Sequence, residues 1–264
     1  MSQQQTFWEH LDELRGSLIK MIAAVLVCSV VAFVFKQQLF DVILAPQSSD
    51  FITYRLLERI SDAVMPGALS DGDVFDVQLI NTGLAQQFVL HIKTAFSVGL
   101  LIALPYLLYL LFSFISPALY TNERKAAVQL VGWGYVMFML GVLLSYYLIF
   151  PLTFRFLGNY QISEVVANTV TVESYIDTLL MVSIAMGIVF EIPVLSWILG
   201  RLGILRSSVM RHYRRHVIVA LLIVAAIITP TSDAFTLFLV ALPMWLLFEL
   251  SIFIVGRVRR SALG

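Results

Sequence analysis

The sequence predicts an all-α integral membrane protein with six transmembrane helices, and three observations support this class. Of the 264 residues, 59% are apolar and 13% are charged, whereas soluble domains carry about 25% charged residues. The mean hydropathy is +0.89. Charged stretches separate six apolar segments, and we treat residues 1–264 as one membrane domain built from them. The six segments are residues 18–35, 94–115, 126–150, 178–200, 217–229 and 234–256.

Charge and cysteine content disfavour several functions. The 17 basic and 17 acidic side chains cancel, so no overall charge favours binding to nucleic acid. The only cysteine, Cys28, excludes an internal disulfide framework and a cysteine-cluster metal site. His212 and His216 lie four residues apart in a basic run without a neighbouring carboxylate, which disfavours a zinc site. No glycine-rich phosphate-binding motif occurs in the sequence, so we expect no cofactor.

Most of the apolar segments are long enough to cross a bilayer. A hydrocarbon core of about 30 Å needs roughly 20 helical residues, but segment 217–229 has only 13. It is expected to be either a re-entrant segment or a short helix that thins the bilayer. The polar turn at 230–233 favours a short pair of helices that cross and return. Acidic residues precede segment 18–35, so we interpret it as a retained span rather than a cleaved signal peptide.

The basic residues predict the orientation in the membrane. Twelve lie on one side of the predicted spans and four on the other, so both termini are expected in the cytoplasm. Residues 6–17 are amphipathic and predict an interfacial helix on the inner surface, and 36–93 form a long outer loop. The twelve are Arg15, Lys20, Arg124, Lys125, Arg201, Arg206, Arg211, Arg214, Arg215, Arg257, Arg259 and Arg260. The four are Lys36, Arg55, Arg59 and Arg155, and the remaining base, Lys93, lies near the edge of their side.

Two carboxylates predicted on the cytoplasmic side are candidates for a binding site. Glu13 lies in the amphipathic segment, and Glu123 follows the second span. A solvated helix face would account for Glu13, and a position in a first helical turn would account for Glu123, without any function. If both lie at one membrane rim, they suit an arginine ligand, whose planar fork pairs bidentately with carboxylates.

Glu191 is the most informative ionisable residue, because it lies near the middle of segment 178–200. An ionisable group at that depth costs about 2.5–3.5 kcal/mol to insert and indicates function by default. Pro193 predicts a bend beside it. The structural alternative is a protonated side chain that hydrogen-bonds a neighbouring helix. A proton-coupled small-solute transporter that uses Glu191 is the second function considered, and the sequence offers no catalytic constellation for an enzyme.

Four motifs, in this order, resemble those of the TatC family, the polytopic core subunit of the twin-arginine protein translocase. The resemblance extends from about residue 7 to residue 254. The motifs are His10-Leu11-Asp12-Glu13-Leu14-Arg15, the loop from Phe114-Ile115-Ser116-Pro117 through Tyr120 to Glu123-Arg124, Phe190-Glu191-Ile192-Pro193, and Leu242-Pro243 with Phe248-Glu249.

The resemblance implies a cupped bundle of six helices in the bacterial inner membrane, with short fifth and sixth helices and cytoplasmic termini. It implies a receptor, not an enzyme, that binds the twin-arginine signal peptides of folded proteins. It also implies self-association and assembly with single-span TatA- and TatB-type subunits, for export driven by the proton-motive force.

Roles for single residues follow from the same resemblance. Glu191 matches an intramembrane glutamate at which single-span partners pack. Leu237 stands where the family often has a glutamine. The residues placed in the signal-peptide motifs are Glu13, Arg15, Phe114, Glu123 and Arg124. Three further matched positions are Pro46, Tyr120 and Asp233.

Overall fold

The computed structural model describes residues 7–64, 78–115, 124–160, 169–229 and 233–261, and the side chains of most of them. Within these ranges, the side chains of 7–11, 13, 61–64, 112–115, 124–130 and 259–261 are left undescribed.

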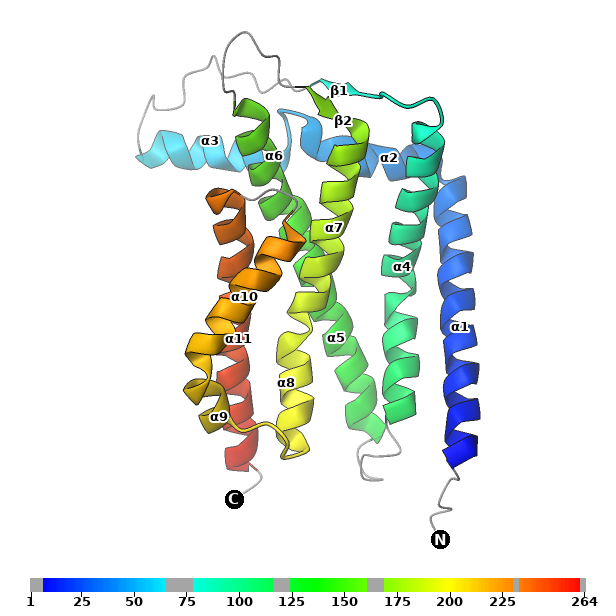
Figure 1. Ribbon diagram of the computed structural model, residues 1–264, viewed down its shortest axis with the longest axis vertical. Helices are drawn as coiled ribbons and strands as arrows, with labels where there is room; N and C mark the ends of the chain where they lie inside the picture. Colours follow the sequence, from blue (N-terminus) through cyan, green and yellow to red (C-terminus); the bar gives the residue numbers. More distant parts are fainter. Residues whose placement is uncertain (1–6, 65–77, 116–123, 161–168, 230–232, 262–264) are drawn as a thin grey trace. The chain divides into compact units, whose positions relative to one another are not determined.

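Helices account for nearly all of the described chain (Figure 1). Five of them are long and apolar enough to cross a membrane, which confirms an all-α membrane fold. Backbone contacts divide the chain into two compact units, Met1–Leu39 with Phe88–Val136 and Phe40–Gln87 with Met137–Gly264. The five candidate spans are Leu14–Val34, Gln86–Leu111, Val131–Asn159, Val172–Arg201 and Ala234–Val258.

The first unit contains α1 (Phe7–Val34), the start of α2 (Lys36–Leu44), most of α4 (Gln86–Ile115) and the first part of α5 (Arg124–Leu144). A separate interfacial helix was expected at 6–17, but α1 runs unbroken from residue 7 through the first apolar segment. The sequence of α1 contains no proline, and Gly16 alone costs only about 1 kcal/mol of helix propensity.

Helices α1 and α4 approach closely at two points within this unit. A Cβ on Gly99 would collide with the backbone of Ser29, so only glycine allows the approach there. Further along, the ring of His91 stacks on Phe33 with centroids 4.0 Å apart. The His91 Nε2 atom also lies 3.1 Å from the Phe33 carbonyl oxygen. These contacts give the buried His91 a polar partner inside a largely apolar pair of helices.

The part of the second unit that follows residue 137 contains, among its described residues, two long interrupted helices and three further helices. A π-helical turn (η4, Ser145–Ile149) joins α5 to α6 (Phe150–Asn159) without a break in helical backbone. Glu191 separates α7 (Val172–Phe190) from α8 (Ile192–Arg201). The remaining helices are α9 (Ser207–His212), α10 (Arg214–Ile228) and α11 (Ala234–Ser261).

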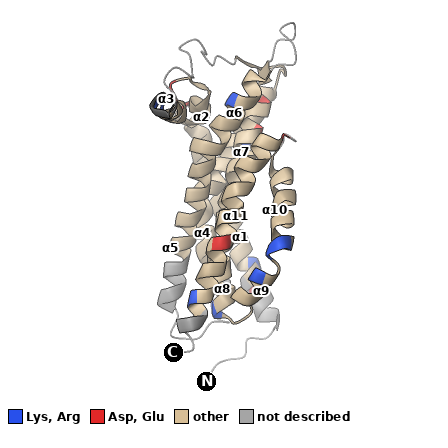
Figure 2. Cartoon of the chain, turned by 90° about the vertical axis from the view of Figure 1, so that its left-hand side faces the viewer, with Lys and Arg blue, Asp and Glu red and all other residues tan. Residues whose placement is uncertain are grey.

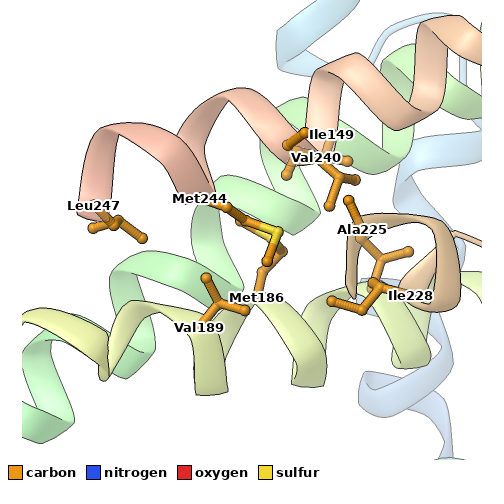
Figure 3. Packing of buried hydrophobic residues seen from close by; sticks show 10 residues of the cluster. Ile149, Met186, Val189, Ala225, Ile228, Val240, Met244 and Leu247 are labelled. Atoms are coloured by element: carbon orange, nitrogen blue, oxygen red, sulfur yellow. The ribbon is translucent and has the colours of Figure 1, made fainter. Parts of the chain in front are cut away.

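The core of the second unit lies between α7, α10, α11 and the π turn (Figure 3). Met186 and Met244 meet at its centre, and both are almost completely buried. Flexible thioether side chains fill irregular space between helices better than branched ones do. The other buried members of this cluster are Ile149, Val182, Val189, Ala225, Ile228, Val240, Ala241 and Leu247.

Small residues bring α5 and α7 together beside this core. A Cβ on Gly141 would lie 2.5 Å from the Met186 carbonyl oxygen, and one on Gly187 would lie 2.7 Å from the Phe138 ring. Four residues from these glycines, the hydroxyls of Ser145 and Ser183 are 3.3 Å apart and buried. Each helix therefore contributes a pair of small residues spaced by four, the pattern that lets membrane helices pack closely.

The segments expected outside the membrane contain short helices and a two-stranded parallel sheet. A 3₁₀ turn (η1, Ala45–Gln47) and α3 (Ile52–Val64) follow α2. Strand β1 (Leu79–Ile80) pairs in parallel with β2 (Val170–Thr171), immediately before α7. The side-chain amide of Gln86 also donates a hydrogen bond to the carboxylate of Glu173. The ladder and this bond tie the long loop to the start of α7.

The last two helices differ in length. Helix α10 has 15 residues, about 22 Å of helix, which is short for a bilayer, as segment 217–229 predicted. Helix α11 has 28 residues, longer than the short sixth helix expected, because the helix continues past the apolar stretch into its basic end.

Arg214 at the start of α10 and Glu249 of α11 form an ion pair at 2.7 Å. Lys and Arg residues gather around α8, α9 and the start of α10 (Figure 2).

Candidate functional site

The structure describes the predicted signal-peptide residues only in part. Glu123 and Tyr120 lie outside the described residues. Glu13 falls in α1, Phe114 in α4 and Arg124 at the first position of α5, but their side chains are not described. Arg15 is an exposed residue of α1. The meeting of Glu13 with Glu123 at one rim therefore stays a prediction.

Glu191 lies at the break between α7 and α8, as the bend predicted at Pro193 requires. Its backbone N–H donates to the Ile188 carbonyl at 3.1 Å, a three-residue turn in place of the helical four. Pro193 has no N–H to offer the carbonyl of Val189, four residues earlier. The chain resumes as a helix when Leu195 donates to the Glu191 carbonyl at 2.9 Å.

The side chain of Glu191 is half-buried, and its Oε1 atom is buried without a hydrogen-bond partner among the described residues. On either side of it, Phe190 and Ile192 pack against the hydrophobic core of the second unit. These contacts hold the backbone in place while the carboxyl group keeps unused hydrogen-bonding capacity. Such a group suits a polar contact with another molecule or helix, because a buried polar atom without a partner is costly.

Pro46 is buried in the 3₁₀ turn η1, and three tyrosines donate to carbonyls of this turn and of the end of α2. The Tyr54 hydroxyl lies 3.1 Å from the carbonyl oxygens of both Pro46 and Pro151. The last carbonyls of a helix have no partner inside it, and two of those in α2 receive tyrosine hydroxyls. Tyr146 donates to Val42 at 2.6 Å, and Tyr175 donates to Ile43 at 3.0 Å.

Helix α3 is fastened to the π turn through the same neighbourhood. Pro151 cannot donate to the Tyr147 carbonyl four residues before it, and the Thr53 hydroxyl donates to that carbonyl instead. Burial raises the pKa of the Tyr54 hydroxyl, and the nearby Arg155 offsets part of that rise. The Tyr54 hydroxyl therefore stays protonated, and able to donate, well above neutral pH.

Replacing Tyr175 with phenylalanine should lower the free energy of unfolding by about 1–3 kcal/mol, because the buried Ile43 carbonyl loses this donor. The measurement is the midpoint of thermal unfolding in detergent. Tyr109→Phe is a matched control, since Tyr109 is 51% exposed and should lose little when its hydroxyl is removed. Equal midpoints for the two variants would show that the Tyr175 hydrogen bond does not stabilise the end of α2.

Asp233 acts as the N-cap of α11. Its Oδ1 atom accepts a hydrogen bond from the Thr236 N–H at 2.7 Å, and its carbonyl accepts from the Leu237 N–H at 3.1 Å. A carboxylate at this position satisfies a free N–H and interacts well with the helix dipole. Leu237, at the position where the family often has glutamine, packs against the core of the second unit.

Sequence reasoning missed the residues that fasten this part of the molecule together. The small pairs of α5 and α7 were detectable, because Gly141 with Ser145 and Ser183 with Gly187 each show the spacing of four. The hydrogen bonds from Tyr54, Tyr146 and Tyr175 had no local signal in the sequence.

Among the described residues, no group of three or more histidine, cysteine or acidic side chains could hold a metal ion.

Comparisons with known proteins connect this geometry to one family. The family model of the Sec-independent protein translocase protein (TatC) matches residues 9–243. The TatC of Deinococcus radiodurans is 34% identical over 257 residues, which cover 96% of this chain and 86% of that protein. The TatC of Aquifex aeolicus is 32% identical, with 93% and 92% covered. The TatC of Blattabacterium sp. subsp. Periplaneta americana is 31% identical, with 95% of both covered.

A solved structure agrees with the sequence comparisons. The crystal structure of a twin arginine translocase receptor, TatC, superposes with a TM-score of 0.75 at 32% identity. The superposition covers 95% of this chain and 100% of that one. Matches of this extent show that the chain belongs to the TatC family, multi-pass membrane proteins that are components of the Sec-independent protein translocase and not enzymes.

Proposed function

We propose that this chain is the receptor subunit of a twin-arginine translocase, which binds the twin-arginine signal peptides of folded proteins at its cytoplasmic face. The observation that carries the proposal is the likeness, over 95% of the chain, to a twin arginine translocase receptor. The relatives described above are protein translocase subunits, which favours export of proteins over transport of small solutes.

The distribution of basic residues supports an orientation with both termini in the cytoplasm. Twelve bases on the side of the termini against four on the other satisfy the positive-inside rule. The bacterial inner membrane is the membrane that this orientation and the family suit. With both termini in the cytoplasm, the motifs of Glu13 and Glu123 would lie on the side of the membrane where newly folded proteins are found.

The chemistry of the ligand supports Glu13 and Glu123 as its binding residues. An arginine guanidinium offers two parallel N–H groups to one carboxylate, so two carboxylates can hold two neighbouring arginines. Lysine has a point charge and lacks this fork. Arg15, Phe114 and Arg124 belong to the same two motifs, and we place them around the bound peptide.

Glu191 is the proposed contact for a single-span TatA- or TatB-type subunit. Its half-buried carboxyl group, with Oε1 unpaired among the described residues, can accept a hydrogen bond from a polar group on a partner helix. Polar side chains link helices within membranes in this way. Assembly with such subunits and self-association would form the complex in which the proton-motive force drives export.

Neutralising the two carboxylates tests the receptor site. Glu13→Gln and Glu123→Gln should each weaken binding of a fluorescent signal peptide at least about tenfold, since hydrogen bonds to charged groups contribute about 1.5–3 kcal/mol. The titration uses the purified protein in detergent. Asp12→Asn is the matched control, because it removes a neighbouring carboxylate outside the proposed site. Normal peptide binding by the double variant would contradict the site.

A further inference from the structure

Helix α3 has an exposed apolar stripe that the translocase role does not use. Ile52, Leu56 and Ile60 are 62%, 58% and 52% exposed. Their spacing of four residues aligns them along one side of the helix. Three large aliphatic side chains in a row are unusual on a surface that faces water.

The other sides of α3 have different surroundings. Thr53 and Tyr54 face the protein and are buried. Arg55, Glu58 and Arg59 are exposed and, at about 100° per residue, lie on a third side that begins beside Ile52 and reaches nearly opposite Leu56 at Glu58. The helix therefore presents one side to protein, one apolar side and one charged side. A helix at a junction of protein, lipid and water needs these three sides.

Hydrogen bonds fix the depth of α3 relative to a membrane span. Thr53 donates to the Tyr147 carbonyl, and Tyr54 donates to the Pro151 carbonyl. Both acceptors belong to the candidate span Val131–Asn159. They lie where its uncharged stretch ends, since Arg155 is the first charged residue after it. The same Arg155 lies over the Tyr54 ring, 5.6 Å from its centroid. Helix α3 is thus bound to the end of the uncharged stretch of this span, where the edge of a hydrocarbon region is expected.

The direction of α3 and its neighbours also fit a lipid interface. Helix α3 runs across the direction of α6 and α7 rather than along it (Figure 1). Tyr147 and Leu148, on the span to which α3 is bound, are 44% and 43% exposed, so this span also presents apolar side chains at the level of α3. Tyrosines are enriched at the level of the headgroups. Arginines beside a stripe of aliphatic residues, on the polar part of the helix surface, are typical of interfacial helices.

We propose that α3 is an interfacial helix, with Ile52, Leu56 and Ile60 inserted among the phospholipid acyl chains next to the headgroups. The occupant of the stripe is the lipid leaflet itself, and no partner subunit is needed to cover it. By anchoring to lipid on one side and to Tyr147 and Pro151 on the other, α3 holds this end of the span at a set depth in the bilayer.

The test places a fluorescent probe on α3 in nanodiscs that contain only this protein. Cys28 is the sole cysteine, so Leu56→Cys in a Cys28→Ala background accepts one environment-sensitive label. The nanodiscs contain phosphatidylethanolamine and phosphatidylglycerol, with or without lipids that carry a nitroxide on the acyl chain. Glu58→Cys in the same background is the matched control on the charged side. Ile60→Cys repeats the measurement on the stripe if the first variant is not monodisperse.

A probe at residue 56 should be quenched several-fold more by the acyl-chain nitroxide than a probe at 58, and should be protected from aqueous iodide. Equal access of iodide to both positions, without quenching by the nitroxide, would overturn the proposal. Protection at 56 that appears only after single-span subunits are added would also overturn it, because a protein would then be the occupant.

Discussion

Replacing Gly141 with alanine should lower the free energy of unfolding by about 1–3 kcal/mol, the cost of overpacking a tight core. The added Cβ would lie 2.5 Å from the Met186 carbonyl oxygen and 2.9 Å from the Phe190 ring. A backbone carbonyl cannot rotate away as a side chain can, so α5 and α7 must separate. Loss of this contact also moves Phe190, the residue next to Glu191. The measurement is the midpoint of unfolding in detergent.

A second glycine of α5 provides the matched control. A Cβ added at Gly132 would meet nothing within 4 Å, so Gly132→Ala should be neutral or slightly stabilising. Gly187→Ala should be destabilising but less so than Gly141→Ala, since its Cβ would meet the edge of the Phe138 ring at 2.7 Å and a side chain can move where a backbone carbonyl cannot. If Gly141→Ala and Gly132→Ala unfold at the same midpoint, the close approach of α5 and α7 does not stabilise the second unit.

Replacing Glu191 with leucine should abolish export and leave the protein at least as stable as before. Burying a polar atom without a hydrogen bond costs about 1–3 kcal/mol, and leucine removes that cost at Oε1. It also removes the group that we propose contacts a single-span partner. Export of a reporter with a twin-arginine signal peptide, measured in cells, should fall to background. The purified variant should still bind the signal peptide.

Glu191→Gln tests whether export needs the hydrogen-bonding capacity of this side chain or its ionisable carboxyl group. Glutamine keeps an acceptor and adds a donor, so it should restore part of the export that leucine abolishes. Normal export by Glu191→Leu would contradict the proposed partner contact. A lower unfolding midpoint for Glu191→Leu would show instead that the carboxyl group stabilises the fold of this chain.

The sequence predicted the features that depend on local chemistry. Uninterrupted apolar stretches predicted the membrane fold, and the short segment 217–229 predicted the short α10. The missing N–H of Pro193 predicted the break at which Glu191 lies, and that prediction is confirmed. These features could be predicted because each depends on residues only a few positions apart.

Contacts between distant residues could not be predicted in the same way. Tyr146 and Val42 are 104 residues apart, and no pattern in either segment indicates that a hydroxyl of one meets a carbonyl of the other. The same holds for Thr53 and Tyr147, which are 94 residues apart. Helix α1 differs from the separate helix expected at 6–17 for another reason. A change from polar to apolar sequence marks a membrane boundary, but it does not end a helix.

Binding of two signal peptides to the purified protein tests the receptor function most directly. One peptide carries the natural arginine pair, and the other has both arginines replaced by lysine. We predict a clear preference for arginine, lost in Glu123→Ala, because only arginine pairs bidentately with a carboxylate. Equal binding of both peptides, with single-span subunits present as well as absent, would contradict recognition of the arginine pair by this chain.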